Sequence, residues 1–186
     1  MTADREKKVL RIPKKHDPGG HETPTPADGE RLVRAQSVGH ACFAAFIAVI
    51  LFSVLWAMVS TTFGRVFPWM TLVLGMFVGL AVRRAGHGID WRFPVIAALF
   101  ATVGSIVANV VVAAANTAPE LDTGTLEILR NVTSMTWPVF FEEVMTAADF
   151  VFAAFAAGLA AFYATRNLNR RQYQALRMWQ ESRSDD

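Results

Sequence analysis

The sequence predicts an all-α, polytopic membrane protein with four transmembrane helices and both termini in the cytoplasm. Three observations lead to this fold class. Four segments are long and free of charged residues, only 18% of the 186 residues are charged, and the basic residues gather outside those segments. Soluble domains carry roughly 25% charged residues, and uncharged apolar runs of about 18 or more residues are typical of membrane-spanning helices.

A basic region precedes the first apolar segment. Residues 1–36 carry eight Lys and Arg, several Pro and Gly, and no Phe, Trp or Tyr. This composition predicts a disordered cytoplasmic tail, because it offers too little apolar surface to fold alone. The basic block from Arg5 to Lys15 is suited to contact anionic lipid headgroups, at about 1 kcal/mol for each basic residue near the surface. The first apolar run comes too late and is too long for a cleaved signal peptide.

Residues 37–166 are predicted to form the four-helix transmembrane domain. About 17 to 25 helical residues cover the ~30 Å hydrocarbon core of a bilayer. The second segment is the shortest, with 17 uncharged residues between Arg65 and Arg83, so we expect a nearly upright helix or snorkelling arginines. The predicted spans are about 38–62, 66–82, 93–115 and 147–165.

Two further segments lie outside the predicted spans. The long connection after the third span is expected to hold a short amphipathic helix near Leu126–Thr133. Its residues Trp137, Phe140 and Phe141 predict an aromatic belt at the membrane interface. Residues 167–186 are predicted to form a basic amphipathic helix or tail, suited to the membrane surface or to a partner.

The distribution of Lys and Arg predicts the orientation. Eight lie in the N-terminal tail, three in the connection between the second and third spans, and five in the C-terminal tail. The other two connections hold Arg65 and Arg130 alone. Basic residues are enriched on the cytoplasmic side of membrane proteins, so both termini are predicted to be cytoplasmic. The net charge of +2 is then explained by topology, and no nucleic-acid partner is expected.

No catalytic, cofactor-binding or metal-binding set stands out, so the chain is not expected to be an enzyme. The single Cys42 excludes a Cys-based zinc site within one chain. No two of the four histidines have the i, i+4 spacing of metal ligands on a helix. Haem ligation by His40 would need a facing histidine at a similar depth. No Ser-His-acid set or Gly-rich phosphate loop is present.

Three carboxylates near the fourth span are the candidates for acid–base chemistry. Glu142, Glu143 and Asp149 stand at the edge of an apolar run, where intramembrane acids are functional candidates. Asp149 lies 17 residues before Arg166, roughly 25 Å along a helix, so it is expected at the rim of the hydrocarbon core. The sequence Thr146-Ala-Ala-Asp149 also matches a capping box, which favours a helix start.

Small residues predict the faces along which the spans pack. Gly75 and Gly79 form a GxxxG pair, and Ala153 and Ala157 belong to a stripe of alanines. Small residues allow close approach of helices within a membrane. Asn109 lies deep in the third span, and we expect it to have a hydrogen-bond partner on another helix.

A glycine-ended segment, an arginine and a Gly-x-Gly-Ile-Asp turn precede the Phe-led third span. The positions of this pattern and of its continuation in the third and fourth spans are Gly79, Arg83, Gly86, Gly88, Asp90, Phe93, Gly104, Asn109, Asp149 and Phe152. Through these positions, residues 66–166 resemble a widespread family of small, uncharacterised bacterial four-span membrane proteins. Members often carry an N-terminal zinc ribbon, whose cysteines are absent here. The resemblance implies a fold and no activity.

These features favour a non-catalytic protein of the bacterial cytoplasmic (inner) membrane, acting as an accessory or assembly subunit of a larger membrane complex. Its expected partners are the bilayer and other membrane-protein subunits or further copies of itself. Two alternatives remain open. One is a small homo-oligomeric channel or transporter, with a pore lined by Ser105, Asn109 and Asn116. The other is an outer-leaflet lipid-active enzyme that uses the three carboxylates.

Overall fold

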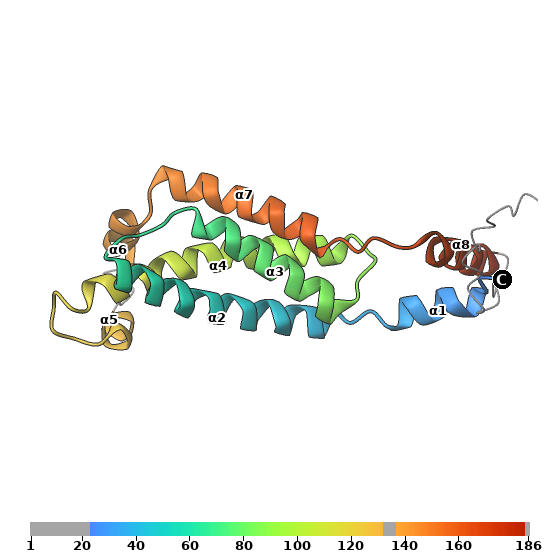
Figure 1. The fold of residues 1–186 in the computed structure, drawn as a ribbon, viewed down its shortest axis with the longest axis horizontal. Coiled ribbons are helices and arrows are strands. Elements are labelled where there is room, and N and C mark those ends of the chain that lie inside the picture. Colours follow the sequence, from blue (N-terminus) through green and yellow to red (C-terminus); the bar gives the residue numbers. More distant parts are fainter. Residues whose placement is uncertain (1–22, 132–136, 185–186) are drawn as a thin grey trace, which may run out of the picture.

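The computed structural model describes residues 23–131 and 137–184, apart from the side chains of Phe140 and Glu143. Within these ranges all regular secondary structure is α-helical, which confirms the all-α part of the predicted fold class (Figure 1). The helices are α1 (Pro26–Arg34), α2 (Val38–Phe63), α3 (Met70–Gly86), α4 (Arg92–Thr117), α5 (Thr125–Asn131), α6 (Trp137–Val144), α7 (Ala147–Ala164) and α8 (Arg170–Ser184).

The four long helices α2, α3, α4 and α7 form an elongated bundle. Successive members run in opposite directions, and α5 and α6 lie at the end opposite to α1 and α8 (Figure 1). Helices α3 and α4 each contact the other three members of the bundle. In the described ranges α2 and α7 do not contact each other, so they occupy opposite sides of the α3–α4 pair.

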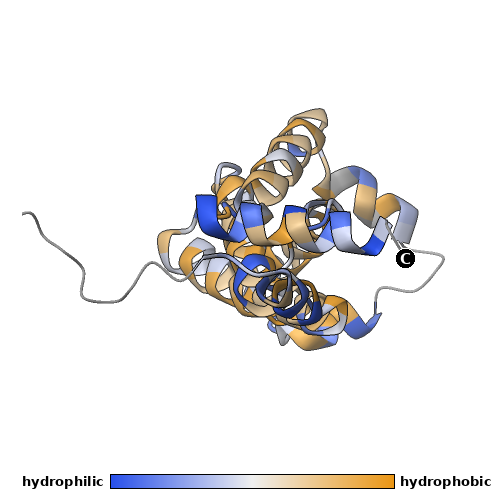
Figure 2. Ribbon diagram, turned by 90° about the vertical axis from the view of Figure 1, so that its right-hand side faces the viewer, coloured by the Kyte–Doolittle hydropathy of each residue, from blue (hydrophilic) through white to orange (hydrophobic). Residues whose placement is uncertain are grey.

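Three helices are long and apolar enough to cross a membrane: α2, α4 and α7, which match the first, third and fourth predicted spans. The predicted second span corresponds to α3, which has 17 residues and falls outside that set. Figure 2, which views the molecule from the α1 and α8 end, shows mainly hydrophobic bundle helices and hydrophilic stretches on α1 and α8. The chain therefore has the helices of a membrane protein.

Helix α3 is shifted along the chain relative to its predicted span. It begins at Met70 rather than at residue 66, because the segment before it forms a tight turn around Pro68. In that turn the amides of Met70, Thr71 and Leu72 donate to carbonyls three residues earlier. At its other end α3 continues to Gly86 and takes Arg83 into its last turn, where a basic residue is favourable.

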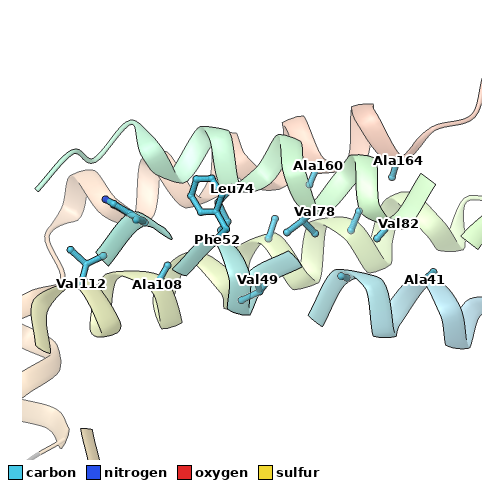
Figure 3. Packing of buried hydrophobic residues seen from close by; sticks show 14 of the residues in the cluster. Ala41, Val49, Phe52, Leu74, Val78, Val82, Ala108, Val112, Ala160 and Ala164 are labelled. Atoms are coloured by element: carbon cyan, nitrogen blue, oxygen red, sulfur yellow. The ribbon is translucent and has the colours of Figure 1, made fainter. Parts of the chain in front are cut away.

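Small side chains at the helix contacts make the bundle core narrow. Ala41, Ala108 and Ala160 are fully buried in the same core cluster as larger residues such as Phe52 and Leu74 (Figure 3). The outward-facing sides of α2, α4 and α7 carry large exposed hydrophobic residues instead. This division is expected in a membrane, where close van der Waals packing rather than the hydrophobic effect holds helices together.

The prediction of a disordered tail over residues 1–36 is wrong for Pro26–Arg34, which forms α1. Residues 1–22, including the basic block from Arg5 to Lys15, lie outside the described residues. Helix α1 contacts α8, so it has a folded partner that composition alone did not reveal. The glycine at its centre, Gly29, is buried against the backbone of Ala175.

A capping box starts α1. The hydroxyl and the amide of Thr25 donate to Asp28 Oδ2, at 2.8 and 3.1 Å. The hydroxyl, and after it the amide, lower the pKa of the Asp28 carboxyl below its ordinary value. Because the folded pKa is lowered, the charged cap contributes stability at neutral pH. That contribution is lost as the pH falls through the lowered pKa.

The connection between α4 and α7 contains two short helices. Helix α5 confirms the predicted helix and extends to Asn131, where the described range ends. Helix α6 differs from the prediction, which assigns its aromatic residues to an interfacial belt without a helix. Its Trp137 and Phe141 rings lie 5.8 Å apart, and Phe141 lies 6.3 Å from Phe150 of α7. These aromatic contacts join the connection to the start of α7.

Candidate functional site

The bundle interior contains polar side chains that the described residues leave unpaired. Three atoms are fully buried without a hydrogen-bond partner there: Trp56 Nε1, Thr71 Oγ1 and Asn109 Nδ2. Each comes from a different helix, namely α2, α3 and α4. Asp149 of α7 is also buried, with 8% of its surface exposed. We call these four residues the polar layer.

Contacts between the helices place the polar layer at one level. A Cβ on Gly104 would meet Val49 at 2.7 Å and Leu74 at 3.5 Å, so these three residues share a level. Ala156 lies directly against Gly75, which sets the level of α7. An α-helix rises about 1.5 Å per residue. Counting along each helix from these contacts to its polar residue places the four residues within about 8 Å of one another along the bundle axis. The layer lies in the half of the bundle nearer to α5 and α6.

Unpaired polar groups are costly in such an interior. A buried donor without an acceptor costs about 1–3 kcal/mol, and intramembrane polar residues are functional candidates by default. The indole N–H of Trp56 is only a donor, and the amide nitrogen of Asn109 also donates. The layer thus presents donors from two helices and a threonine hydroxyl from a third, and it is the main polar feature of the interior.

Asp149 uses one carboxylate oxygen to start α7. The amide and the hydroxyl of Thr146 both donate to Asp149 Oδ2, at 2.9 and 2.6 Å, within a capping box. Helix α7 begins at Ala147, directly after this cap. The charge also lies at the positive end of the helix dipole. Sequence reasoning located both cap residues, while the burial of Asp149 inside the bundle is a result of the tertiary structure.

The other two candidate carboxylates do not join Asp149 in a described cluster. Glu142 is exposed on α6, and the side chain of Glu143 lies outside the described residues. Within residues 23–131 and 137–184, no three His, Cys, Asp or Glu side chains are grouped to hold a metal ion. The described side chains therefore form no metal-binding cluster around Asp149.

The predicted GxxxG pair of α3 lies against α7. A Cβ on Gly75 would collide with the backbone carbonyl of Ala156, and one on Gly79 would meet the Ala160 carbonyl oxygen at 2.5 Å. Ala153 is buried, whereas Ala157 is half-buried and Ala156 holds the close contact. The sequence indicated that α7 packs through a face of small residues. It did not show which alanines touch α3, because a helix of 3.6 residues per turn can turn either of two neighbouring alanines toward its partner.

The expected hydrogen bond from Asn109 to another helix is absent for its amide nitrogen within the described residues. Asn116, one of the proposed pore residues, makes such a bond instead. Its Nδ2 donates to Ser60 Oγ of α2 at 2.9 Å, and Ser60 donates to the carbonyl of Arg65. Ser105 donates to the Ala101 carbonyl of its own helix. Two of the three proposed pore residues are thus satisfied by protein groups.

The turn between α3 and α4 joins the ends of several helices. The Phe93 ring is buried between Gly86 and Gly88, where any Cβ would overlap it. The amide of Ser37 donates to the Gly86 carbonyl at 3.0 Å, and the Ile89 amide donates to Gln36 Oε1 at 3.2 Å. These contacts fasten the start of α2 to the turn.

The fold and the polar layer define a class: an all-helical protein with three helices able to cross a membrane and a buried polar layer among its helices. Comparison of the chain with family models, with curated proteins and with solved structures finds no match.

Proposed function

We propose that this chain is a non-catalytic subunit of the bacterial cytoplasmic membrane that assists the assembly of a larger membrane complex. In this proposal α3 is a fourth span beside α2, α4 and α7, as in the family of small bacterial membrane proteins that residues 66–166 resemble. The observation that carries the proposal is the pair of helices α1 and α8, which projects from one end of the bundle (Figure 1).

The α1–α8 pair is a separate, exposed unit. Within the described residues, each of the two helices contacts only the other one among the eight helices. They pack closely because Gly29 admits the Ala175 backbone and the Trp179 Cβ, which a Cβ on Gly29 would meet at 2.8 Å. The pair thus unites both ends of the described chain into one surface outside the bundle.

The surface of this pair is suited to a polar partner. A groove of about 420 Å³ between the helices is lined by residues that include Asp28, Arg31 and Arg171. On the outer side of α8, Tyr173 is exposed and offers an aromatic contact. Aromatic residues and arginine are enriched at protein–protein contacts.

The substitution Gly29→Leu tests this function. The new side chain has no space against Ala175, so we expect α1 to separate from α8 while the bundle remains folded. Full-length wild-type protein, purified in mild detergent at natural abundance, should carry a membrane partner in fixed stoichiometry. The variant should lose that partner and keep the wild-type melting temperature of the bundle.

The matched control is Gly39→Leu, because a Cβ at Gly39 meets nothing within 4 Å. This variant should retain the partner. Wild-type protein that purifies alone, or a partner that Gly29→Leu retains after α1 has separated, would contradict the proposal.

The proposed orientation places the α1–α8 end in the cytoplasm. Among the described residues, ten Arg lie at this end, whereas Arg65 and Arg130 lie toward the other end. This bias agrees with the enrichment of basic residues on the cytoplasmic side. Reporter fusions at residues 88 and 186 should be active only with cytoplasmic reporters. A periplasmic reporter active at either site would reverse the orientation.

The polar layer supports a second candidate function, as a path for a small solute or a proton. Unpaired polar atoms at the same level along the bundle as the buried Asp149 are the observation that favours it. A residue that only caps α7 has a different role from one that carries a proton, and substitution of Asp149 separates the two.

If Asp149 is only a cap, Asp149→Asn should cost about 0.3–1 kcal/mol, the charge–dipole contribution, and should still rescue a deletion strain. Thr146→Ala should cost about 0.5–2 kcal/mol. A proton-carrying Asp149 predicts that Asp149→Asn is abundant and folded but fails to rescue, while Asp149→Glu rescues. Membrane abundance and deletion rescue, measured together, decide between these results.

A further inference from the structure

A lipid-facing groove lies between α2 and α3. Its volume is about 510 Å³, and its lining residues recur once per helical turn on α2 from Phe43 to Leu55 and on α3 from Phe77 to Arg84. Residues with this spacing lie on one face of each helix, so the groove runs along the side where the two helices meet. The groove is separate from the polar layer and from the α1–α8 pair.

The groove has a narrow apolar form. Its lining includes the small residues Ala44, Ala48 and Ala81, together with large residues such as Phe43 and Leu51, which are 66% and 65% exposed. The Phe77 ring lies 5.5 Å from the ring of Phe52, which is also part of the lining. Large exposed side chains beside small ones leave a slot suited to a flexible hydrocarbon chain.

One cation marks one end of the groove. Arg84 is the single charged residue of the lining. The contact between Gly86 and Ala41 places Arg84 level with Phe43, at the end nearer to α1 and α8. Within residues 23–131 and 137–184, Arg84 makes no ion pair, and its side chain is exposed. An unpaired guanidinium at the rim of a membrane is suited to a phosphate group.

The length of the groove corresponds to one leaflet. The segment from Phe43 to Leu55 extends about 18 Å along α2. One leaflet contributes roughly half of the ~30 Å hydrocarbon core. A transmembrane helix of a partner would continue past the groove through the other leaflet, whereas one acyl chain ends within it.

From this geometry we infer that the α2–α3 groove binds one anionic phospholipid of the leaflet nearer to α1 and α8. An acyl chain lies in the slot, and the headgroup phosphate pairs with Arg84. The inference needs the bundle to lie in a membrane, but it does not depend on the accessory role. In the proposed orientation this leaflet is the cytoplasmic one.

Native mass spectrometry of the full-length protein tests the site with defined lipids. Phosphatidylglycerol and phosphatidylcholine with the same long acyl chains are added separately to the protein in mild detergent. We expect one retained phosphatidylglycerol for each chain, about fivefold more than phosphatidylcholine, as expected for one basic residue beside a net anionic headgroup. Both lipids carry a phosphate, but the choline cation of phosphatidylcholine neutralises its headgroup. Arg84→Gln should abolish this preference. The matched control Arg83→Gln removes the same charge one residue away, outside the groove lining, and should keep it.

Two further arms use only the wild-type chain, so they remain informative if Arg84→Gln fails to fold. Phosphatidylglycerol with short acyl chains should be retained more weakly, and glycerol phosphate should not compete. Displacement by glycerol phosphate would show a soluble-anion site. Equal losses in both arginine variants would show diffuse attraction of headgroups. A second copy or another protein bound in place of the lipid would show a protein interface. Each of these three results would overturn the inference.

Discussion

Replacing Gly75 by leucine is expected to separate α3 from α7 and to prevent assembly of the native bundle. The position has no space even for a methyl group, because a Cβ would lie 2.8 Å from both the carbonyl carbon and the Cα of Ala156 and closer still to its oxygen. These are backbone atoms, so no side-chain rotation relieves the overlap. Overpacking typically costs 1–3 kcal/mol, and a shift of a whole helix exceeds the usual range. We expect a loss of about 3 kcal/mol or more.

The measurement is unfolding of the full-length protein by sodium dodecyl sulfate in detergent micelles. Gly75→Ala should already be destabilised, since the first added carbon makes the collision. Gly158→Ala is the matched control in α7, because a Cβ there meets nothing within 4 Å. It should change the free energy of unfolding by less than about 1 kcal/mol. Wild-type stability of Gly75→Leu would show that α3 and α7 do not pack through this face.

Replacing Gly88 by alanine is expected to open the turn between α3 and α4. The added Cβ would overlap the Phe93 ring, which is 1% exposed and has Gly86 close on its other side. Because the ring is enclosed, the backbone must move, which weakens the hydrogen bonds of the turn to Gln36 and Ser37. We expect a cost of about 2–3 kcal/mol.

A double-mutant cycle gives this prediction a specific control. Phe93→Ala alone should cost about 3–5 kcal/mol through the cavity that it leaves. Adding Gly88→Ala to Phe93→Ala should then cost little, because the overlapping ring is gone, so the two changes are strongly non-additive. Gly124→Ala, where a Cβ meets nothing within 4 Å, should be neutral. Additive losses would mean that Gly88 is required for a reason other than Phe93.

Local signals in the sequence identified much of the candidate site. Thr146 and Asp149 were recognised from their spacing before an apolar run, and the structure places them in a capping box. Gly75 and Gly79 were recognised as small residues one turn apart, and both lie against α7. These features depend on residues three or four positions apart, so they are readable without knowing any other helix.

The missed features depend on segments far apart in the sequence. Trp56 and Thr71 carry no sequence signal for an unpaired polar atom, because their burial arises from α2, α3 and α4 together. The sequence identifies Asn109 as a deep polar residue, but its amide nitrogen lacks the expected hydrogen bond to another helix within the described residues. Asn116 bonds Ser60, 56 positions away, through a helix register that no local pattern specifies.

The sequence by itself determined the helical class, the apolar segments and the strong asymmetry of basic residues. Whether a segment prefers lipid or water depends on its own apolar length and its own charges, so each segment can be judged separately. Only the tertiary structure decided that α3 packs its glycines on α7, that Pro26–Arg34 folds against α8, and that four polar residues share one level. These outcomes depend on which helices meet and at what register, and such contacts form between surfaces that the chain order leaves unspecified.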